Sequence, residues 1–176
     1  VVLFICCVSV LNAAGDWPEF RGPLGTGHAA VKQAPLRWSS KENVVWKQPI
    51  PGQGWSSPVL SAGKIYLTAA VPSDADSSAI GFSLNLLVLS ARSGEVEQTL
   101  PIFQQPADAP NIHRKNSHAS PTPLVEGNHV YVHFGHQGTA CVTKSGRIVW
   151  KNDSLSYQPV HGNGGSPILA GRALVF

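Results

Sequence analysis

Tryptophan, histidine and asparagine side chains occur shortly before three Ser-Pro or Thr-Pro pairs in this chain. They are Trp55, Asn116, His118, His161 and Asn163, in the segments 54–56, 116–118 and 161–164. Indole rings stack on ligands, amides donate and accept hydrogen bonds, and imidazole changes charge near neutral pH. We expect these five residues to contact a ligand or partner and assign no catalytic residue. The alternative is that the glycines around them only make turns and that His118 caps a loop.

Three of the seven histidines, His129, His133 and His136, lie near one another in the sequence. Along a strand, His129 and His133 share a face but stand about 13 Å apart, whereas zinc holds imidazole nitrogens at about 2 Å. His133 and His136 approach each other across Gly135, but no Asp, Glu or Cys accompanies them. We therefore predict no metal site.

A repeated unit organises the segments that position these residues. Each copy has Ser-Pro or Thr-Pro, an apolar strand, a glycine and a second apolar strand, and the copies begin at Ser57, Thr122 and Ser166. Proline is tolerated at the start of a strand and glycine allows a tight hairpin turn. The first two copies continue into a second pair of strands joined by a Ser-Gly turn. Four short antiparallel strands per unit are typical of the blade of a β-propeller.

The predicted fold class is all-β, a propeller of four-stranded antiparallel blades, of which this chain holds the N-terminal two and a half. The segments are a signal-peptide remnant (1–13), an N-terminal extension (14–42) and a partial propeller (43–176), itself divided into a ring-closing strand (43–49), two blades (55–100 and 118–152) and the start of a third (164–176). The first blade has 12 more residues between its turn glycines than the second, which predicts an exposed excursion near 72–82. A long connection is expected at 101–117.

Composition narrows the function and the compartment. Gly and Pro total 31 of 176 residues and only 13% are charged, which excludes a helical bundle. The net charge is +3 without a basic stripe, which argues against nucleic-acid binding. The apolar run 1–11, followed by Ala13 and Ala14, is typical of a signal peptide, so we expect an exported chain without a transmembrane helix after cleavage. An uncleaved membrane anchor is the alternative reading of this run.

The Ser-Pro, Gly-x-x-Tyr-Val and Ser-Gly-x-x-x-Trp pattern resembles the pyrroloquinoline-quinone-like (PQQ-like) propeller repeat. Quinoprotein dehydrogenases and non-catalytic outer-membrane assembly propellers share this repeat, and the segment 16–23 resembles the opening of secreted bacterial members. The repeat often has Asp shortly before its Ser/Thr-Gly turn. Here the stretches are 90–92 and 143–144, which contain none.

The resemblance implies a fold and leaves the activity open. We expect a periplasmic or extracellular scaffold that is not an enzyme, binds no cofactor, and contacts a protein or glycan at the mouth of the propeller channel. The alternative is a dehydrogenase that oxidises an alcohol or sugar with PQQ and calcium, which requires a stacking aromatic group, oxygen ligands and a catalytic Asp. A carbohydrate-binding module, suggested by Trp55 and the nearby amides, is a third reading.

Overall fold

The computed structural model describes residues 15–30, 34–73, 81–106, 112–155, 157 and 159–176. The predicted signal-peptide remnant at 1–13 lies outside these ranges, as does most of the excursion expected near 72–82. The regular secondary structure of the described part is almost entirely β, with ten strands and one short 3-10 helix. No helix in it is long and apolar enough to span a membrane.

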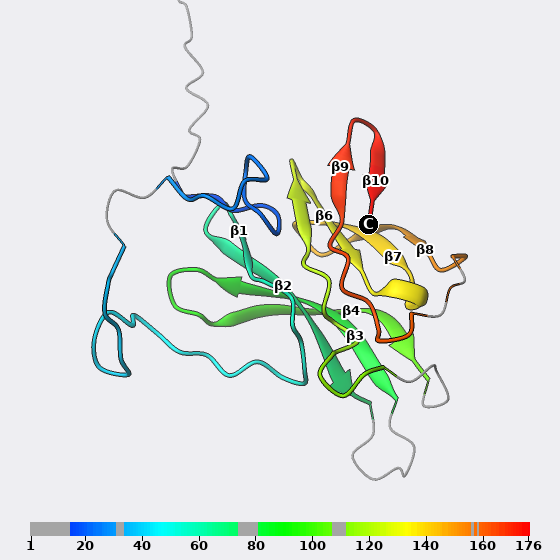
Figure 1. Ribbon diagram of the computed structural model, residues 1–176, viewed down its shortest axis with the longest axis horizontal. Helices are drawn as coiled ribbons and strands as arrows, with labels where there is room; N and C mark the ends of the chain where they lie inside the picture. Colours follow the sequence, from blue (N-terminus) through cyan, green and yellow to red (C-terminus); the bar gives the residue numbers. More distant parts are fainter. Residues whose placement is uncertain (1–14, 31–33, 74–80, 107–111, 156, 158) are drawn as a thin grey trace, which may run out of the picture.

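Two four-stranded antiparallel sheets and one hairpin follow one another along the chain (Figure 1). The first sheet contains β1 (Val59–Ser61), β2 (Lys64–Pro72), β3 (Phe82–Ser90) and β4 (Val96–Gln105). The second contains β5 (Leu124–Glu126), β6 (His129–His133), β7 (Thr139–Thr143) and β8 (Ile148–Asn152), with the 3-10 helix η1 (Gly135–Gln137) between β6 and β7. The hairpin pairs β9 (Ile168–Ala170) with β10 (Ala173–Val175). The strand order within each sheet confirms the predicted propeller blades.

The first blade accommodates its extra residues mainly by lengthening two strands. β2 and β3 have nine residues each, whereas their counterparts β6 and β7 have five. Strand lengthening thus accounts for eight of the 12 additional residues, and the 73–81 connection for the rest. The insertion therefore enlarges the paired sheet at one end of the blade, where the sequence pattern indicated only an exposed excursion.

The outer strand of the first blade continues past the predicted boundary at residue 100. β4 runs to Gln105, so the connection expected from Pro101 begins at residue 106 instead. Pro101 is tolerated because the register shifts beside it: Leu84 pairs with Phe103 and Asn85 with Pro101, which leaves Ile102 as a bulge residue. Ile102 is only 2% exposed and packs in the core between the blades.

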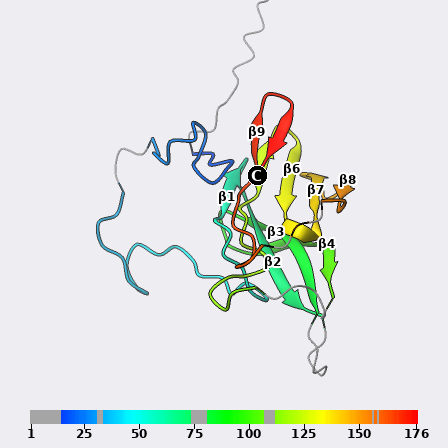
Figure 2. The ribbon, with the colours of Figure 1, turned by 45° about the vertical axis from the view of Figure 1, so that its right-hand side comes forward.

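One hydrophobic core joins the first two blades, which lie side by side in Figures 1 and 2. Alternate residues of β3, Leu84, Leu86 and Val88, meet Val130 and Val132 of β6 in this cluster. This alternation follows from the two-residue period of a strand. A smaller cluster that includes Leu87 and Leu89 occupies the other face of the first blade.

A segment near the N-terminus pairs with the inner strands of both blades. Trp17 forms an antiparallel bridge with Leu60 of β1, and the Pro18 carbonyl accepts a 2.8 Å bond from the Val125 N–H of β5. The Asp16 carboxylate accepts bonds from Ala62 N–H and Ser61 Oγ. Residues 16–18, inside the predicted N-terminal extension, therefore line the inner edges of the propeller blades.

Residues 44–50, which include most of the predicted ring-closing strand, have no strand assignment. Trp46 nevertheless docks on the first blade: its Nε1 donates a 3.1 Å bond to the Ala91 carbonyl, and its ring covers Gly94. Ring closure by this segment stays a prediction.

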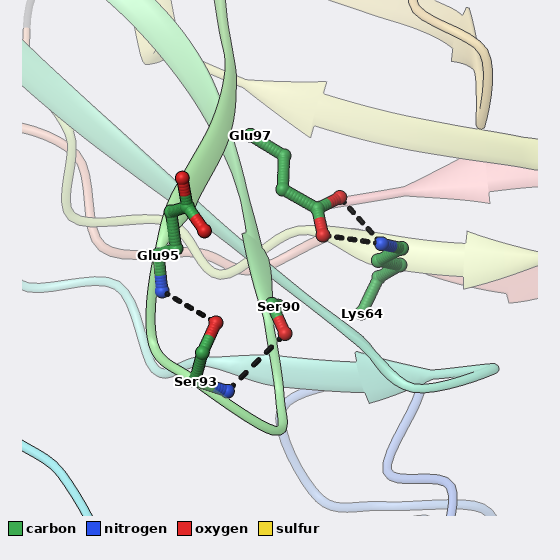
Figure 3. A network of polar contacts seen from close by, with 5 residues as sticks. All are labelled: Lys64, Ser90, Ser93, Glu95 and Glu97. Carbon is green, nitrogen blue, oxygen red and sulfur yellow. Dashed lines mark hydrogen bonds and ion pairs between the residues drawn. The ribbon is translucent and has the colours of Figure 1, made fainter.

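Hydroxyl groups cap the two Ser-Gly turns where the repeat often has Asp. In the first blade, the Ser93 N–H donates to Ser90 Oγ and the Glu95 N–H donates to Ser93 Oγ (Figure 3). In the second, the Arg147 N–H donates to Thr143 Oγ1 at 3.0 Å. A side-chain hydroxyl accepts turn N–H groups as a carboxylate does, though more weakly, so both turns form without Asp. The side chains of the nearby Lys64–Glu97 ion pair are 41% and 33% exposed, so solvent screens the pair and it adds little stability.

Candidate functional site

The antiparallel order places two kinds of connection at opposite ends of the blades. One end, here called the turn face, carries the tight turns at 62–63, 93–94, 127–128, 145–146 and 171–172. The opposite end, here called the loop face, carries the segments before β1, β5 and β9 together with the β2–β3 and β6–β7 connections. All five predicted contact residues lie on the loop face.

Equivalent residues of successive repeats hold the loop face together. The Ser57 N–H donates a 2.9 Å bond to Thr122 Oγ1, and the Thr122 N–H donates a 3.0 Å bond to Ser166 Oγ. Each of these three residues directly precedes the proline of its repeat. The hydroxyls of the second and third pairs, Thr122 Oγ1 and Ser166 Oγ, thus each accept a bond from the preceding repeat. This role was not predicted, although the recurring hydroxyl is visible in the sequence.

The side chain of Asn116 contacts the backbone of His161 and Asn163. The Asn116 Nδ2 donates to the His161 carbonyl at 2.8 Å and to the Asn163 carbonyl at 3.3 Å. Its Oδ1 accepts bonds from Ser117 N–H and Ser120 Oγ. The Nδ2 group thus joins two loops and Oδ1 braces the loop that contains Asn116, so the role of this side chain is to position the loop face.

The Asn163 side chain lies over Gly135, at the start of η1. A Cβ at Gly135 would stand 1.5 Å from Asn163 Nδ2, and Gly135 has a φ of +63°. Only glycine satisfies both constraints without strain. Asn163 thus connects the third repeat to the β6–β7 connection of the second.

His118 lies apart from this group, in a half-buried position between the two blades. Its Nε2 is 3.1 Å from the Gln105 amide nitrogen, and its ring centroid is 5.1 Å from that of Phe82. Burial, and next the nearby His136, lower the pKa of His118. An uncharged ring at neutral pH follows, which suits packing and hydrogen bonding better than anion binding. The contacts of His118 with Gln105 and Phe82 were not predicted, because Gln105 lies in the segment that was expected to be a loop.

Two further histidines of the loop face are also held neutral. His133 has Nδ1 2.8 Å from Thr139 Oγ1 and Nε2 3.1 Å from the Tyr157 hydroxyl, and burial lowers its pKa to about 4. Burial likewise lowers the pKa of His136, whose Nε2 lies 2.8 Å from the Gln137 side-chain nitrogen. Both ring nitrogens of His133 are therefore occupied by protein partners.

Trp55 and His161 are exposed, whereas the other three predicted residues, Asn116, His118 and Asn163, are partly buried. The Trp55 backbone N–H donates to the Ala119 carbonyl at 3.1 Å, which fixes the main chain, while the residue is 67% exposed. An exposed indole on an anchored backbone suits contact with a partner, since tryptophan supplies a large rigid contact area.

The described residues of the loop face do not fit a calcium-bound quinone cofactor. No group of three or more His, Cys, Asp or Glu able to hold a metal ion occurs among the described residues. Four of the described acids lie on or beside the turn face: Asp16, Glu95, Glu97 and Glu126. Calcium requires six to eight oxygen ligands, usually with carboxylates among them.

The buried thiol is also unsuited to chemistry. Cys141 on β7 is 1% exposed, and burial raises its pKa, so the reactive thiolate is disfavoured. This environment agrees with the packing role expected for a cysteine in an apolar strand.

Comparison with known proteins agrees with this architecture. A family model described as outer membrane protein assembly factor BamB matches residues 70–176, from the end of β2 through the β9–β10 hairpin. No curated protein matches the chain. The match covers more than half of the chain and the blades have the strand order of PQQ-like repeats, so the chain belongs to the PQQ-repeat β-propeller family described as outer membrane protein assembly factor BamB.

Proposed function

We propose that this protein is an exported, non-catalytic scaffold of the bacterial envelope that binds a protein partner through its loop face and needs no cofactor. The observation that carries the proposal is the chain of bonds from Ser57 to Thr122 and from Thr122 to Ser166, which makes one continuous surface from the loops of three repeats. A surface that is ordered before binding costs less conformational entropy when a partner docks.

The polar groups of the loop face favour binding over catalysis. General acid–base chemistry needs a titratable group that is free to exchange a proton with a substrate. His133 has both ring nitrogens occupied, and His118 shares its Nε2 with Gln105. Asn116 is committed to joining two loops. These residues stiffen the surface on which the exposed Trp55 is displayed.

The family match supports a protein partner. The family is described as an outer membrane protein assembly factor, which is a protein-binding role in the cell envelope. Export of this chain is part of the same proposal and rests on the apolar run at 1–11 together with that description.

Site-specific photo-crosslinking tests this function. Trp55 and Trp38 are exposed to similar extents, 67% and 71%, but Trp38 belongs to the N-terminal segment before the first blade. Each is replaced in turn by a photoreactive phenylalanine analogue in the full-length protein, expressed in its own host. The proposal predicts a crosslink to one envelope protein from position 55 and none from position 38. Equal crosslinking from both positions, or crosslinking only to glycan at position 55, would contradict it.

A further inference from the structure

A hollow of about 350 Å³ on the loop face is lined by His113, Lys115, Asn116 and His161. It forms where the connection from β4 to β5 meets the connection from β8 to β9. The His113 N–H donates to the His161 carbonyl at 3.4 Å, and the two imidazole rings lie edge to face with centroids 5.5 Å apart. We call this feature the basic hollow.

The side chains that line the basic hollow present hydrogen-bond donors. The Lys115 N–H donates to His113 Nδ1 at 3.1 Å, so in the neutral ring of His113 the proton lies on Nε2. The Asn116 Nδ2 group is already hydrogen-bonded to the His161 and Asn163 carbonyls. What stays available to a ligand is His113 Nε2–H, the His161 ring and the Lys115 ammonium group.

No carboxylate lines the basic hollow among the described residues. Among the residues that the structure describes, Lys115 forms no ion pair. The ion pair found there joins Lys64 and Glu97 in the first blade. Arg114, which is also exposed, adds a second cation beside the hollow. An electropositive hollow that presents donors attracts anions.

The backbone around the basic hollow favours a side-chain carboxylate over a phosphate group. Phosphate sites commonly use several free backbone N–H groups that converge on the anion. Here the N–H groups of His113, Lys115, Asn116 and Gly162 are already donated within the loops. The remaining donors sit on separate side chains from two loops, an arrangement that suits a series of carboxylates along a peptide.

We infer that the basic hollow binds the carboxylates of an acidic segment of the partner protein. This inference rests on the proposed function and names the chemistry by which the loop face recognises its partner. Because the hollow is open to solvent, binding weakens as salt screens the charges.

A labelled oligoglutamate peptide is the probe for this inference. Its affinity for the full-length protein is measured by fluorescence anisotropy at low ionic strength, where salt screens the charges least. The site variant is Lys115→Gln with His161→Gln, which keeps every backbone bond of the two loops. The matched control, Lys41→Gln with His28→Gln, removes the same two groups from exposed positions of the N-terminal segment.

The inference predicts that the site variant binds oligoglutamate about tenfold more weakly, whereas the control stays within about twofold of the wild type. Equal weakening in both variants would overturn it, since net charge alone would then explain binding. Tighter binding of inorganic phosphate than of the peptide would overturn it too. If either result occurs while the Trp55 crosslink still forms, this inference fails and the proposed function stands. If the Trp55 crosslink is lost while the site variant still weakens peptide binding and the control does not, the proposed function fails and anion binding by the basic hollow stands.

Discussion

The backbone N–H of Ser57 donates a 2.9 Å hydrogen bond to Oγ1 of Thr122, the residue at the equivalent place in the next repeat. The Thr122 N–H in turn donates an equivalent bond to Ser166 Oγ. The Ser-Pro and Thr-Pro pairs thus do two things: the proline precedes an inner strand, and the hydroxyl before it ties neighbouring blades together. Thr122 is 2% exposed, so water does not replace this bond when it is lost.

Removing the Thr122 hydroxyl should weaken the contact between the blades. Thr122→Val keeps the shape but leaves the Ser57 N–H without its acceptor, and we expect a loss of about 2 kcal/mol in the free energy of unfolding. Thr122→Ser keeps the acceptor and loses one methyl group, at a cost of about 1 kcal/mol or less. Urea denaturation measures both values, and hydrogen exchange at the Ser57 amide should accelerate only in the valine variant. A valine variant no less stable than the serine variant would refute this role.

The contact between Trp46 and Gly94 should be sensitive to a single methyl group. Gly94 and Gly63 both have a φ of +75°, but a Cβ at Gly94 would stand 2.4 Å from the Trp46 ring, whereas nothing lies within 4 Å of one at Gly63. Gly63→Ala should cost about 1 kcal/mol through backbone strain alone. Gly94→Ala should cost about 3 kcal/mol, because it also displaces the indole. Thermal unfolding compares the two variants, and equal losses would show that Trp46 contributes no packing there.

Stability should fall at mildly acidic pH because of His133. Its folded-state pKa is about 4, below the ordinary value of about 6.5, so between these values the unfolded chain binds a proton that the folded chain does not. The free energy of unfolding therefore decreases as the pH falls from about 6.5 to about 4. We expect about 2 kcal/mol from this group, since the exposed Tyr157 beside it admits water that screens part of the cost.

Two variants separate His133 from the other titrating groups. His133→Asn should flatten the decrease, whereas His129→Asn on the same strand should leave it unchanged. Unfolding curves measured across this pH range provide the test. An unaltered slope in the His133 variant would assign the acid sensitivity elsewhere, for example to His118 or His136, whose pKa values burial also lowers.

Asn116 should be intolerant of a negative charge. In Asn116→Asp, a carboxylate oxygen replaces the Nδ2 donor and faces the carbonyl oxygens of His161 and Asn163. We expect a loss of about 2 kcal/mol and faster hydrogen exchange in 112–120 and 159–165. Asn128→Asp, at a turn on the opposite face, should change neither quantity. Unchanged exchange in the Asn116 variant would mean that the two loops are held by other contacts.

The sequence predicted the parts of the fold that depend on local signals. Each Ser-Pro or Thr-Pro start and its following glycine identified a hairpin, and the register of all three hairpins confirms this prediction. Proline and glycine act on the backbone of their immediate neighbours, so a single sequence reveals them. The family assignment followed from the same residues.

Features that depend on distant contacts could not be predicted in this way. The end of β4 was placed too early, because Pro101 indicates a break unless the bulge opposite Leu84 and Asn85 is known. The pairing of Trp17 with Leu60 joins segments more than forty residues apart and has no signature in either one.

The candidate site shows the same division between local and distant information. Asn116, His161 and Asn163 were expected to contact a ligand or partner, which stays a prediction, and only the structure assigns the Asn116 amide to joining two loops. Gln105, which shares a nitrogen contact with His118, was hidden in the misplaced loop. Of the five predicted residues, Trp55 and His161 are the exposed ones on the loop face.

Titration of the full-length protein with pyrroloquinoline quinone and calcium tests most directly whether this propeller is a scaffold. After removal of free cofactor, absorbance and calorimetry report what stays bound. The scaffold account predicts no saturable binding at cofactor concentrations well above micromolar, because the described residues of the loop face offer no cage of oxygen ligands for calcium. Saturable one-to-one binding would contradict the account and identify the protein as a quinoprotein whose alcohol or sugar substrate should then be sought.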